Sequence, residues 1–365
     1  MNNMTVTTRA MYTAATSRTM TVQEAVMLLR QEMKPRTLPD KLARFAKGRD
    51  LRTLLAEGLK ANHPDKKPDS MDRKVRDWLG GKDRAIRKED AVELCFILSL
   101  TVEEADELLM LVCEEGFHWR DPAEIPFIFA LKQGIEYPAA CALAERMAAV
   151  CTAPETEAED SYTGVIRAEV AALQSEAQLA EYLRGAAARL GKMHNTAYQL
   201  FMEYMTLLEE GDIADLLEDA TAMSTRDVVE QYFFRRFVPR VKGSEKALSA
   251  IQRAVWSNWP DEVSVSRMKS RVIDVTRKVM ILLFIATDGG MDDEDEALID
   301  EWEDESVFED TYTRLNEMLA MCGFAPLDPR APFDWMMLYC MCVEDVFDMD
   351  AQMEAFLGTL FDGEV

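Results

Sequence analysis

The sequence has few of the residues that build metal sites and disulfide frameworks. Its three histidines lie far apart, and its seven cysteines include no CxxC spacing. Metal sites usually bring His and Cys together at spacings of three or four residues, and disulfide scaffolds have an even, patterned cysteine count. We therefore expect reduced thiols in a cytoplasmic protein, with no metal and no cofactor.

Signatures of the common enzyme classes are also missing. The chain contains no P-loop, no GxGxxG and no GxSxG. Carboxylates are abundant, but only geometry can identify a catalytic pair among them. We interpret the chain as a protein that is not an enzyme.

Long hydrophobic runs are absent. The longest uninterrupted apolar run is eight residues, 279–286, whereas a helix needs roughly 20 apolar residues to span a bilayer. The first 20 residues lack the apolar core of a signal peptide. We expect no membrane association.

Helical patterns dominate what is present. Capping boxes at 21–24, 101–104 and 306–309 each open a segment with apolar residues at helical spacing, and residues 200–217 show the same spacing. Runs of alternating β-branched residues are absent. The sequence therefore predicts an all-α fold.

Composition shifts divide the chain. We predict a loose N-terminal arm (1–20), a helical domain (21–150), a polar linker (151–161), a helical middle region (162–245) and a helical C-terminal domain (246–365). An acidic insertion at 288–310, where 13 of 23 residues are Asp or Glu, interrupts the last of these. A block with this much charge of one sign repels itself, so we expect it to be solvated.

Charge is segregated along the chain. The formal net charge of -25 argues against nucleic acid at first sight. However, residues 34–88 hold 17 Lys or Arg against 8 Asp or Glu, and residues 235–278 hold 11 against 4. These two basic islands carry +9 and +7, so the mean charge does not exclude a local contact with DNA.

The first basic island predicts a series of short helices, followed by two apolar ones. We place them at 38–46, 51–61, 70–79, 87–100 and 101–113, with a turn at 62–69. Ser70 is the expected N-cap of the third helix and Gly80 its stop. Val75, Trp78 and Leu79 share one face of that helix.

This stretch resembles the helix-turn-helix domains of the lambda-repressor-like (XRE) class. The resemblance is carried by Val75-x-x-Trp78-Leu79-x-Gly81, Ile86-Arg87, the helix at 91–98 and Leu100-Thr101-x-Glu103-Glu104-Ala105-x-x-Leu108-Leu109. The next segment, Gly116-Phe117-His118-Trp119-Arg120-Asp121-Pro122, is similar to the "GF-x-x-x-DP" continuation of divergent members common in Firmicutes. The resemblance covers residues 38–116 and implies a five-helix domain whose third helix reads DNA. The predicted turn is longer than usual for this class.

The resemblance implies two sets of DNA-contacting residues. The recognition helix would present Ser70, Arg73, Lys74, Arg76 and Asp77 to the major groove. The DNA backbone would be contacted by Lys66, Lys67, Lys82, Arg84 and Arg87. Arginine can read guanine edges in a bidentate manner, and lysine gains affinity by neutralising phosphate.

The second basic island resembles a degenerate copy of the first. Residues 264–267 and 277–286 echo 70–73 and 87–98, and Gly323-Phe324-x-x-x-Asp328-Pro329 has the spacing of the first GF…DP motif. An internal duplication or chance similarity between apolar helices would both explain the echo. A real copy would present Arg267, Lys269 and Arg271 as a second DNA-facing set.

Two hypotheses follow from the sequence. The first is a DNA-binding transcription regulator of helix-turn-helix type that contacts double-stranded DNA, with the remaining helices serving homodimerisation or partner binding. The alternative is a helical adaptor that binds a basic protein partner and whose helix-turn-helix-derived domain no longer binds DNA. A continuous basic surface would favour the first, and cations neutralised by carboxylates would favour the second.

Overall fold

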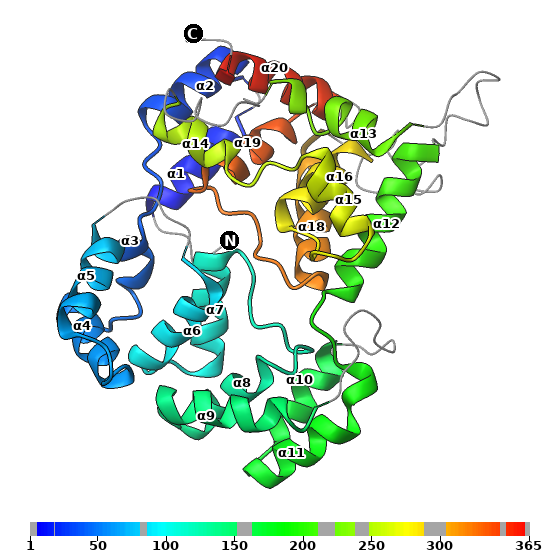
Figure 1. Ribbon diagram of the computed structural model, residues 1–365. Coiled ribbons are helices and arrows are strands. Elements are labelled where there is room, and N and C mark those ends of the chain that lie inside the picture. The colour runs from blue at the N-terminus through cyan, green and yellow to red at the C-terminus, as the bar shows by residue number, and fades with distance from the viewer. Residues whose placement is uncertain are drawn as a thin grey trace. The chain divides into compact units, whose positions relative to one another are not determined.

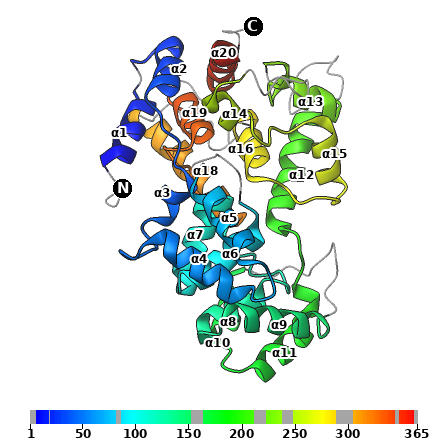
Figure 2. The ribbon, with the colours of Figure 1, turned by 60° about the vertical axis from the view of Figure 1, so that its left-hand side comes forward.

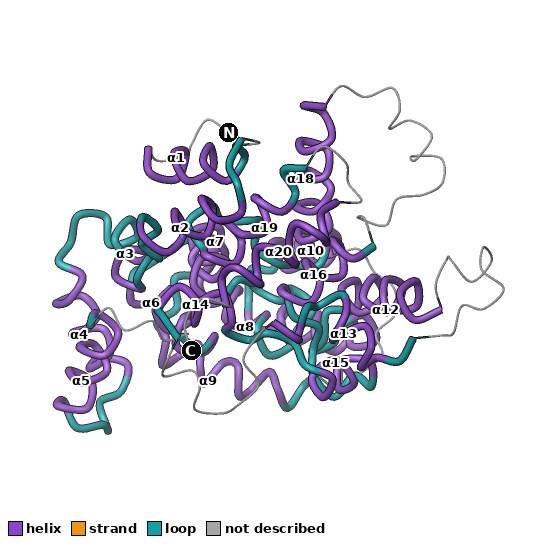
Figure 3. Tube along the Cα trace, turned by 90° about the horizontal axis from the view of Figure 1, so that it is seen from above, coloured by secondary structure: helices purple, strands orange, loops and turns teal. Residues whose placement is uncertain are grey.

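The described part of the chain is all-helical. The computed structural model describes residues 6–17, 19–80, 86–151, 163–210, 223–237, 248–287, 304–343 and 348–361. Every regular element in these ranges is a helix (Figure 3). The one β-type pairing among them is an isolated antiparallel bridge between Glu115 and Phe324. The predicted fold class is confirmed.

The chain divides into two compact units that do not follow the predicted segment boundaries. Unit 1 comprises residues 1–35, 196–322 and 326–365, and unit 2 comprises residues 36–195 and 323–325. The first two helices therefore belong with the C-terminal helices, and a three-residue segment from late in the chain belongs to unit 2. The predicted linker at 151–161 lies, apart from Cys151, outside the described residues.

Unit 2 contains the first basic island. Its helices are α3 (Leu38–Leu42), α4 (Leu51–Asn62), α5 (Pro68–Leu79), α6 (Lys88–Ile97), α7 (Val102–Cys113), α8 (Ile125–Gln133), α9 (Tyr137–Ala148), α10 (Thr163–Ala172), α11 (Glu176–Gly185) and the 3-10 turn η1 (Ala187–Arg189). The predicted capping box at Thr101 is present at the start of α7. Helices α3 to α7 pack together as one group (Figures 1 and 2).

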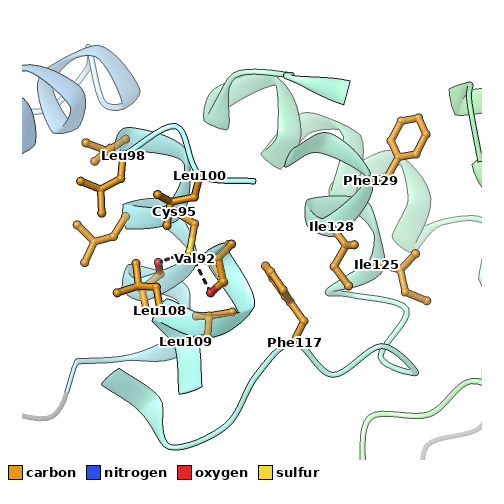
Figure 4. Packing of buried hydrophobic residues seen from close by; sticks show 14 of the residues in the cluster. Val92, Cys95, Leu98, Leu100, Leu108, Leu109, Phe117, Ile125, Ile128 and Phe129 are labelled. Carbon is orange, nitrogen blue, oxygen red and sulfur yellow. Dashed lines mark hydrogen bonds between the residues drawn. The ribbon is translucent and has the colours of Figure 1, made fainter. Parts of the chain in front are cut away.

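The core of unit 2 is centred on α6. Six of its ten residues are buried, among them Leu94 and Cys95. The Cys95 thiol donates to the carbonyls of Ala91 and Ala105, which joins α6 to α7 (Figure 4). Phe117 and the first turns of α8 extend this apolar cluster beyond α7. Burial raises the pKa of the Cys95 thiol, so the group behaves as a small apolar side chain.

Unit 1 is built around two largely buried helices, α16, in which nine of ten residues are buried, and α19. Its elements are α1 (Val6–Ala15), α2 (Val22–Gln31), α12 (Asn195–Glu210, whose first residue is assigned to unit 2), α13 (Thr225–Gln231), η3 (Arg235–Phe237), α14 (Ala250–Trp256), α15 (Glu262–Lys269), α16 (Arg277–Ala286), α18 (Asp304–Met321), α19 (Pro332–Cys340) and α20 (Met349–Phe361). All nine residues of α19 are buried. Helices buried on all sides are typical of the centre of a domain, and here they include the buried charged residues Arg277, Lys278 and Asp334.

Three local expectations in unit 1 have different outcomes. The capping box at Thr21 is present. The predicted loose arm, in contrast, forms α1, and the Trp335 indole donates to the Met11 carbonyl at 2.9 Å. The helix expected to begin at Ser306 begins at Asp304, inside the predicted acidic insertion. Residues 288–303 of that insertion lie outside the described residues.

Candidate nucleic-acid interface

Helices α4 and α5 form a helix–turn–helix pair with a short connection. Asp50 caps α4 by accepting from the Thr53 amide at 2.8 Å. Helix α4 ends at Asn62 and α5 begins at Pro68, so the turn is shorter than the sequence predicted. Proline is well suited to the first helical position because it has no amide hydrogen to satisfy there. The N-cap of α5 is accordingly Lys67 and not the expected Ser70.

The buried face of α5 is the one that the sequence predicted. Val75 and Met71 are buried, and Trp78 and Leu79 pack partly buried against the same cluster. Gly58 allows the neighbouring α4 to approach α6, because a Cβ there would lie 2.6 Å from Cγ2 of Ile97. The opposite face of α5 is left at the surface of unit 2.

Lys74 does not belong to that exposed face. Its ammonium lies 2.9 Å from Oδ1 of Asp90 and 3.4 Å from Oε2 of Glu93, both on α6. It also lies 4.6 Å from the centre of the Trp78 ring. The geometry makes Lys74 a tie between α5 and α6.

Glu93 is the buried end of this tie. It is 2% exposed and accepts from the Asn62 amide at 3.1 Å, with the His63 imidazole 2.9 Å away. A carboxylate this buried requires partners, because an unpaired buried charge is costly. The end of α4, α5 and α6 are thereby held together by one polar group.

The remaining residues of the predicted recognition set lie on the exposed face of α5. Ser70, Arg73, Arg76 and Asp77 are all exposed. Arg73 pairs with Asp77 at 4.0 Å, one turn later on the same helix. Arg76 has no ion pair among the described residues. Exposed i,i+4 pairs contribute little to stability, so Arg73 is not firmly held.

The predicted backbone-contacting set divides into three groups. Lys66 and Lys67 are exposed in the turn before α5. Arg87 is exposed but pairs with Asp90 at 3.3 Å. Burial acts to raise the pKa of Asp90, but the hydrogen bonds from Lys74 and Arg87 outweigh it and lower that pKa below its ordinary value. Lys82 and Arg84 lie outside the described residues.

Several other cations of the first basic island are neutralised by carboxylates that follow it in the sequence. The pairs, each joined at 2.6 to 3.1 Å, are Arg44 with Glu107, Lys47 with Glu104, and Lys88 with Glu115 and Glu124. Lys66 and Lys67 in the turn and Arg76 on α5 are exposed without such a partner among the described residues, as is Arg52 at the start of α4.

The second candidate set is only partly exposed. Arg267 lies exposed on α15. Lys269 pairs with Glu209 of α12 at 2.7 Å, and the Arg271 guanidinium lies 4.3 Å from the centre of the Tyr198 ring. Two of the three predicted cations thus serve contacts inside unit 1.

Metal sites and membrane-spanning helices are not found in the described ranges. No group of three or more His, Cys, Asp or Glu side chains in these ranges is arranged to hold a metal ion. None of the described helices combines the length and apolar character needed to cross a membrane. Comparison of the chain with known proteins finds no matching family model, no similar curated protein and no similar solved structure.

Proposed function

We propose that this protein binds double-stranded DNA through the exposed face of α5 and the turn before it, and acts as a transcription regulator of helix-turn-helix type. The observation that supports the proposal most is the arrangement of four exposed cations, Lys66, Lys67, Arg73 and Arg76. They lie on the second helix of a helix–turn–helix pair and at its entrance. The XRE-class resemblance assigns this same helix to the major groove.

The chemistry of the four cations fits separate tasks. Arginine side chains at the centre of a recognition helix can pair with the O6 and N7 atoms of guanine. Lysines at the amino end of the helix neutralise phosphates, where the helix dipole also favours an anion. Lys74 supports this surface from behind by fixing α5 to α6.

The direct test is duplex binding by the full chain, measured by fluorescence anisotropy on a labelled duplex at two salt concentrations. Neutralising two phosphates, by Lys66 and Lys67, predicts a salt slope of about −1.8, so affinity should fall roughly 10-fold from about 50 to about 200 mM salt. Combined Arg73→Ala and Arg76→Ala changes should weaken binding at least ~10-fold. Arg184→Ala, an exposed arginine on α11, is the matched control and should leave affinity unchanged. Unchanged binding by the double variant would refute the interface.

A second candidate function is supported by the ion pairs. Lys47, Arg44 and Lys88 are neutralised within unit 2, and the exposed face of α5 also carries Asp69 and Asp77. This mixed charge suits an adaptor that binds a basic protein partner. Absence of duplex binding at about 50 mM salt, with the chain folded, would favour this function over the first.

Dimerisation is part of the first proposal, because readers of two-fold symmetric DNA sites are typically dimers. Light scattering after size-exclusion chromatography measures the mass of the particle directly. A monomer at the concentration at which DNA is bound would remove the dimer from the proposal and leave the α5 surface in place.

A further inference from the structure

Two of the three histidines stack on each other inside unit 2. His118 and His194 are far apart in the sequence, yet their ring centroids are 4.1 Å apart with the planes 18° from parallel. The His194 ring also lies 5.6 Å from the ring of Phe324. Nothing in the function proposed above uses this pair.

The stack lies where three segments of unit 2 meet. The Ala325 amide donates to the Glu114 carbonyl at 2.9 Å, and the Gly116 amide donates to the Gly323 carbonyl at 3.4 Å. The loop that carries His118 is tied to the segment before His194, because the Gly191 amide donates to the Arg120 carbonyl at 2.9 Å. The histidine rings therefore lie at a junction of three segments that these backbone hydrogen bonds join.

Both glycines of the repeated GF motif are required at this junction. A Cβ on Gly116 would lie 2.5 Å from Oδ1 of Asp106. Gly323 has a φ of +78°, which only glycine adopts readily, and a Cβ there would lie 3.4 Å from the His194 ring. The Gly116 position is therefore closely packed, whereas the constraint at Gly323 is its backbone conformation.

Charged groups face the histidines from every element around them. They are Lys88 of α6, Glu115, Arg120 and Asp121 of the loop, Glu124 at the start of α8, and Lys192 in the segment before His194. Lys88 and Glu124 neutralise each other at 2.7 Å, and the His118 amide donates to Glu124 at 2.8 Å. None of these carboxylates forms an ion pair with the His118 ring.

The closed junction favours the neutral form of His118. The side chain is 7% exposed, and burial lowers its pKa well below the ordinary value. His194, Lys88 and Arg120 act in the same direction, because each would repel a second positive charge. A backbone carbonyl at Lys192 opposes the shift without reversing it.

We propose that the stack is an acid-sensitive latch: when His118 takes up a proton, the segment 323–325 is released from residues 114–116. A neutral His118 ring packs against His194 at 4.1 Å, whereas a charged ring in this closed junction is repelled by Lys88 and Arg120 and has no ion-pair partner among the carboxylates named above. The residues immediately before and after this segment belong to unit 1, so the latch controls one of the places where the chain leaves unit 2. The latch does not depend on DNA binding.

The pH range follows from the sign of the linkage. A histidine whose pKa is lowered in the closed state binds its proton more readily when the junction is open. The closed state is then fully favoured above about pH 6.5, the unperturbed value, and loses about tenfold in its equilibrium constant per pH unit below it for each proton taken up. One unit below, at about pH 5.5, proton uptake by His118 opens the junction about tenfold more often.

Hydrogen–deuterium exchange with mass spectrometry on the full chain tests the latch. Protection, corrected for the intrinsic pH dependence of exchange, is compared at about pH 7.5 and about pH 5.5 for peptides covering 114–118 and 322–327. We expect it to fall ~10-fold in these peptides. A peptide from α6 should keep its protection, which separates local release from unfolding of unit 2.

Three variants complete the experiment. His118→Phe keeps a flat ring but cannot take up a proton, so it should remove the pH response. His63→Gln, at the third histidine, should leave the response in place. Should His118→Phe fail to fold, His118→Gln, which also cannot take up a proton, decides. The latch is refuted by protection that does not change with pH in the natural chain, by an undiminished response in the folded His118 variant, or by equal loss in α6.

Discussion

Replacing Lys74 with Met separates the structural role of this residue from DNA recognition. Methionine keeps the length of the lysine stem against Trp78 but removes the ammonium that lies 2.9 Å from Asp90 and 3.4 Å from Glu93. The Lys74 side chain is 26% exposed, whereas that of Glu93 is 3% exposed. The variant therefore leaves a buried carboxylate with one cationic partner fewer.

The cost can be bounded from the contacts that remain. Removing one partner from a fully buried ion pair costs about 3–5 kcal/mol. Glu93 keeps Asn62 and His63, and Asp90 keeps Arg87, so most of each carboxylate's hydrogen bonding survives. Because Lys74 is also partly exposed, we expect the free energy of unfolding to fall by about 2 kcal/mol.

Two assays read the two roles independently. Urea unfolding followed by tryptophan fluorescence measures the loss of stability, and anisotropy measures duplex affinity at a temperature where the variant is folded. We expect Lys74→Met to keep its affinity within about twofold. Arg76→Ala should do the reverse and change stability by less than about 0.5 kcal/mol while weakening binding at least ~10-fold. The reasoning is refuted if Lys74→Met keeps full stability, or if it loses affinity to the same degree as Arg76→Ala.

Three further predictions concern packing and charge. Arg277→Met removes one partner of the bidentate ion pair with Asp334, in which the distances are 2.8 and 2.9 Å and both side chains are 5% exposed. Urea unfolding should show that the free energy of unfolding falls by about 3–5 kcal/mol. Adding Asp334→Leu should recover part of this loss. Gly58→Ala should lower stability by about 1–3 kcal/mol through the close approach to Ile97, although alanine alone favours a helix; a stabilised variant would show that α4 and α6 are not in close contact. Because the pKa of Asp90 is lowered in the folded chain, its contribution is present above about pH 4 and is lost as the pH falls through the folded value. The stability difference between the natural chain and Lys74→Met should therefore shrink toward pH 3, and a constant difference would contradict the assigned pairing.

Local structure was predictable where local interactions decide it. Thr21 and Thr101 each accept from the amide three residues later, and both helix starts follow from the sequence. The start of α5 was misplaced because Ser70 is a good capping residue, whereas the actual first residue, Pro68, needs no side-chain cap. Residues 1–20 were predicted to form a loose arm, whereas residues 6–15 form α1. This helix packs against α19, which is more than 300 residues away in the sequence, so no local sequence pattern indicates the contact.

The exposure of the candidate residues on α5 follows from the sequence for all of them except Lys74. Lys74 follows Met71 by three residues and precedes Trp78 by four, so helical spacing alone places it at the border of the buried face. The helical spacing indicates a partly buried Lys74, whereas its charge alone favours an exposed side chain. The partners of Lys74 could not be predicted from the sequence, because Asp90 and Glu93 lie on another helix, just after the first basic island (34–88). Net charge along a sequence overestimates exposed charge wherever a neighbouring helix supplies the counter-ions.

The two GF…DP motifs lead into the same local structure. In each, the aspartate side chain accepts from the amide two residues later: Asp121 from Ala123 at 2.8 Å, and Asp328 from Arg330 at 3.0 Å. Each aspartate carbonyl also accepts from the amide three residues later. Turns of this kind are common after aspartate, so this similarity alone is weak support for a common origin.

A second similarity concerns a carboxylate in each unit that accepts from a backbone amide six residues earlier and forms an ion pair with the first residue of another helix. Glu124, just before α8, accepts from an amide six residues earlier at 2.8 Å and pairs with Lys88 at the start of α6. Asp334 of α19 also accepts from an amide six residues earlier at 2.8 Å and pairs with Arg277 at the start of α16. In the alignment of the two copies, however, Lys88 stands opposite Lys278 and Glu124 opposite Ala331, so this similarity does not follow the duplication, which stays a prediction. The two units also differ in the cations that they leave exposed to DNA. In unit 1, Lys269 and Arg271 are engaged by Glu209 and Tyr198, which leaves Arg267 as the one exposed member of the second candidate set. In unit 2 both arginines of α5 are exposed, so the proposed interface belongs to α5 and not to α15.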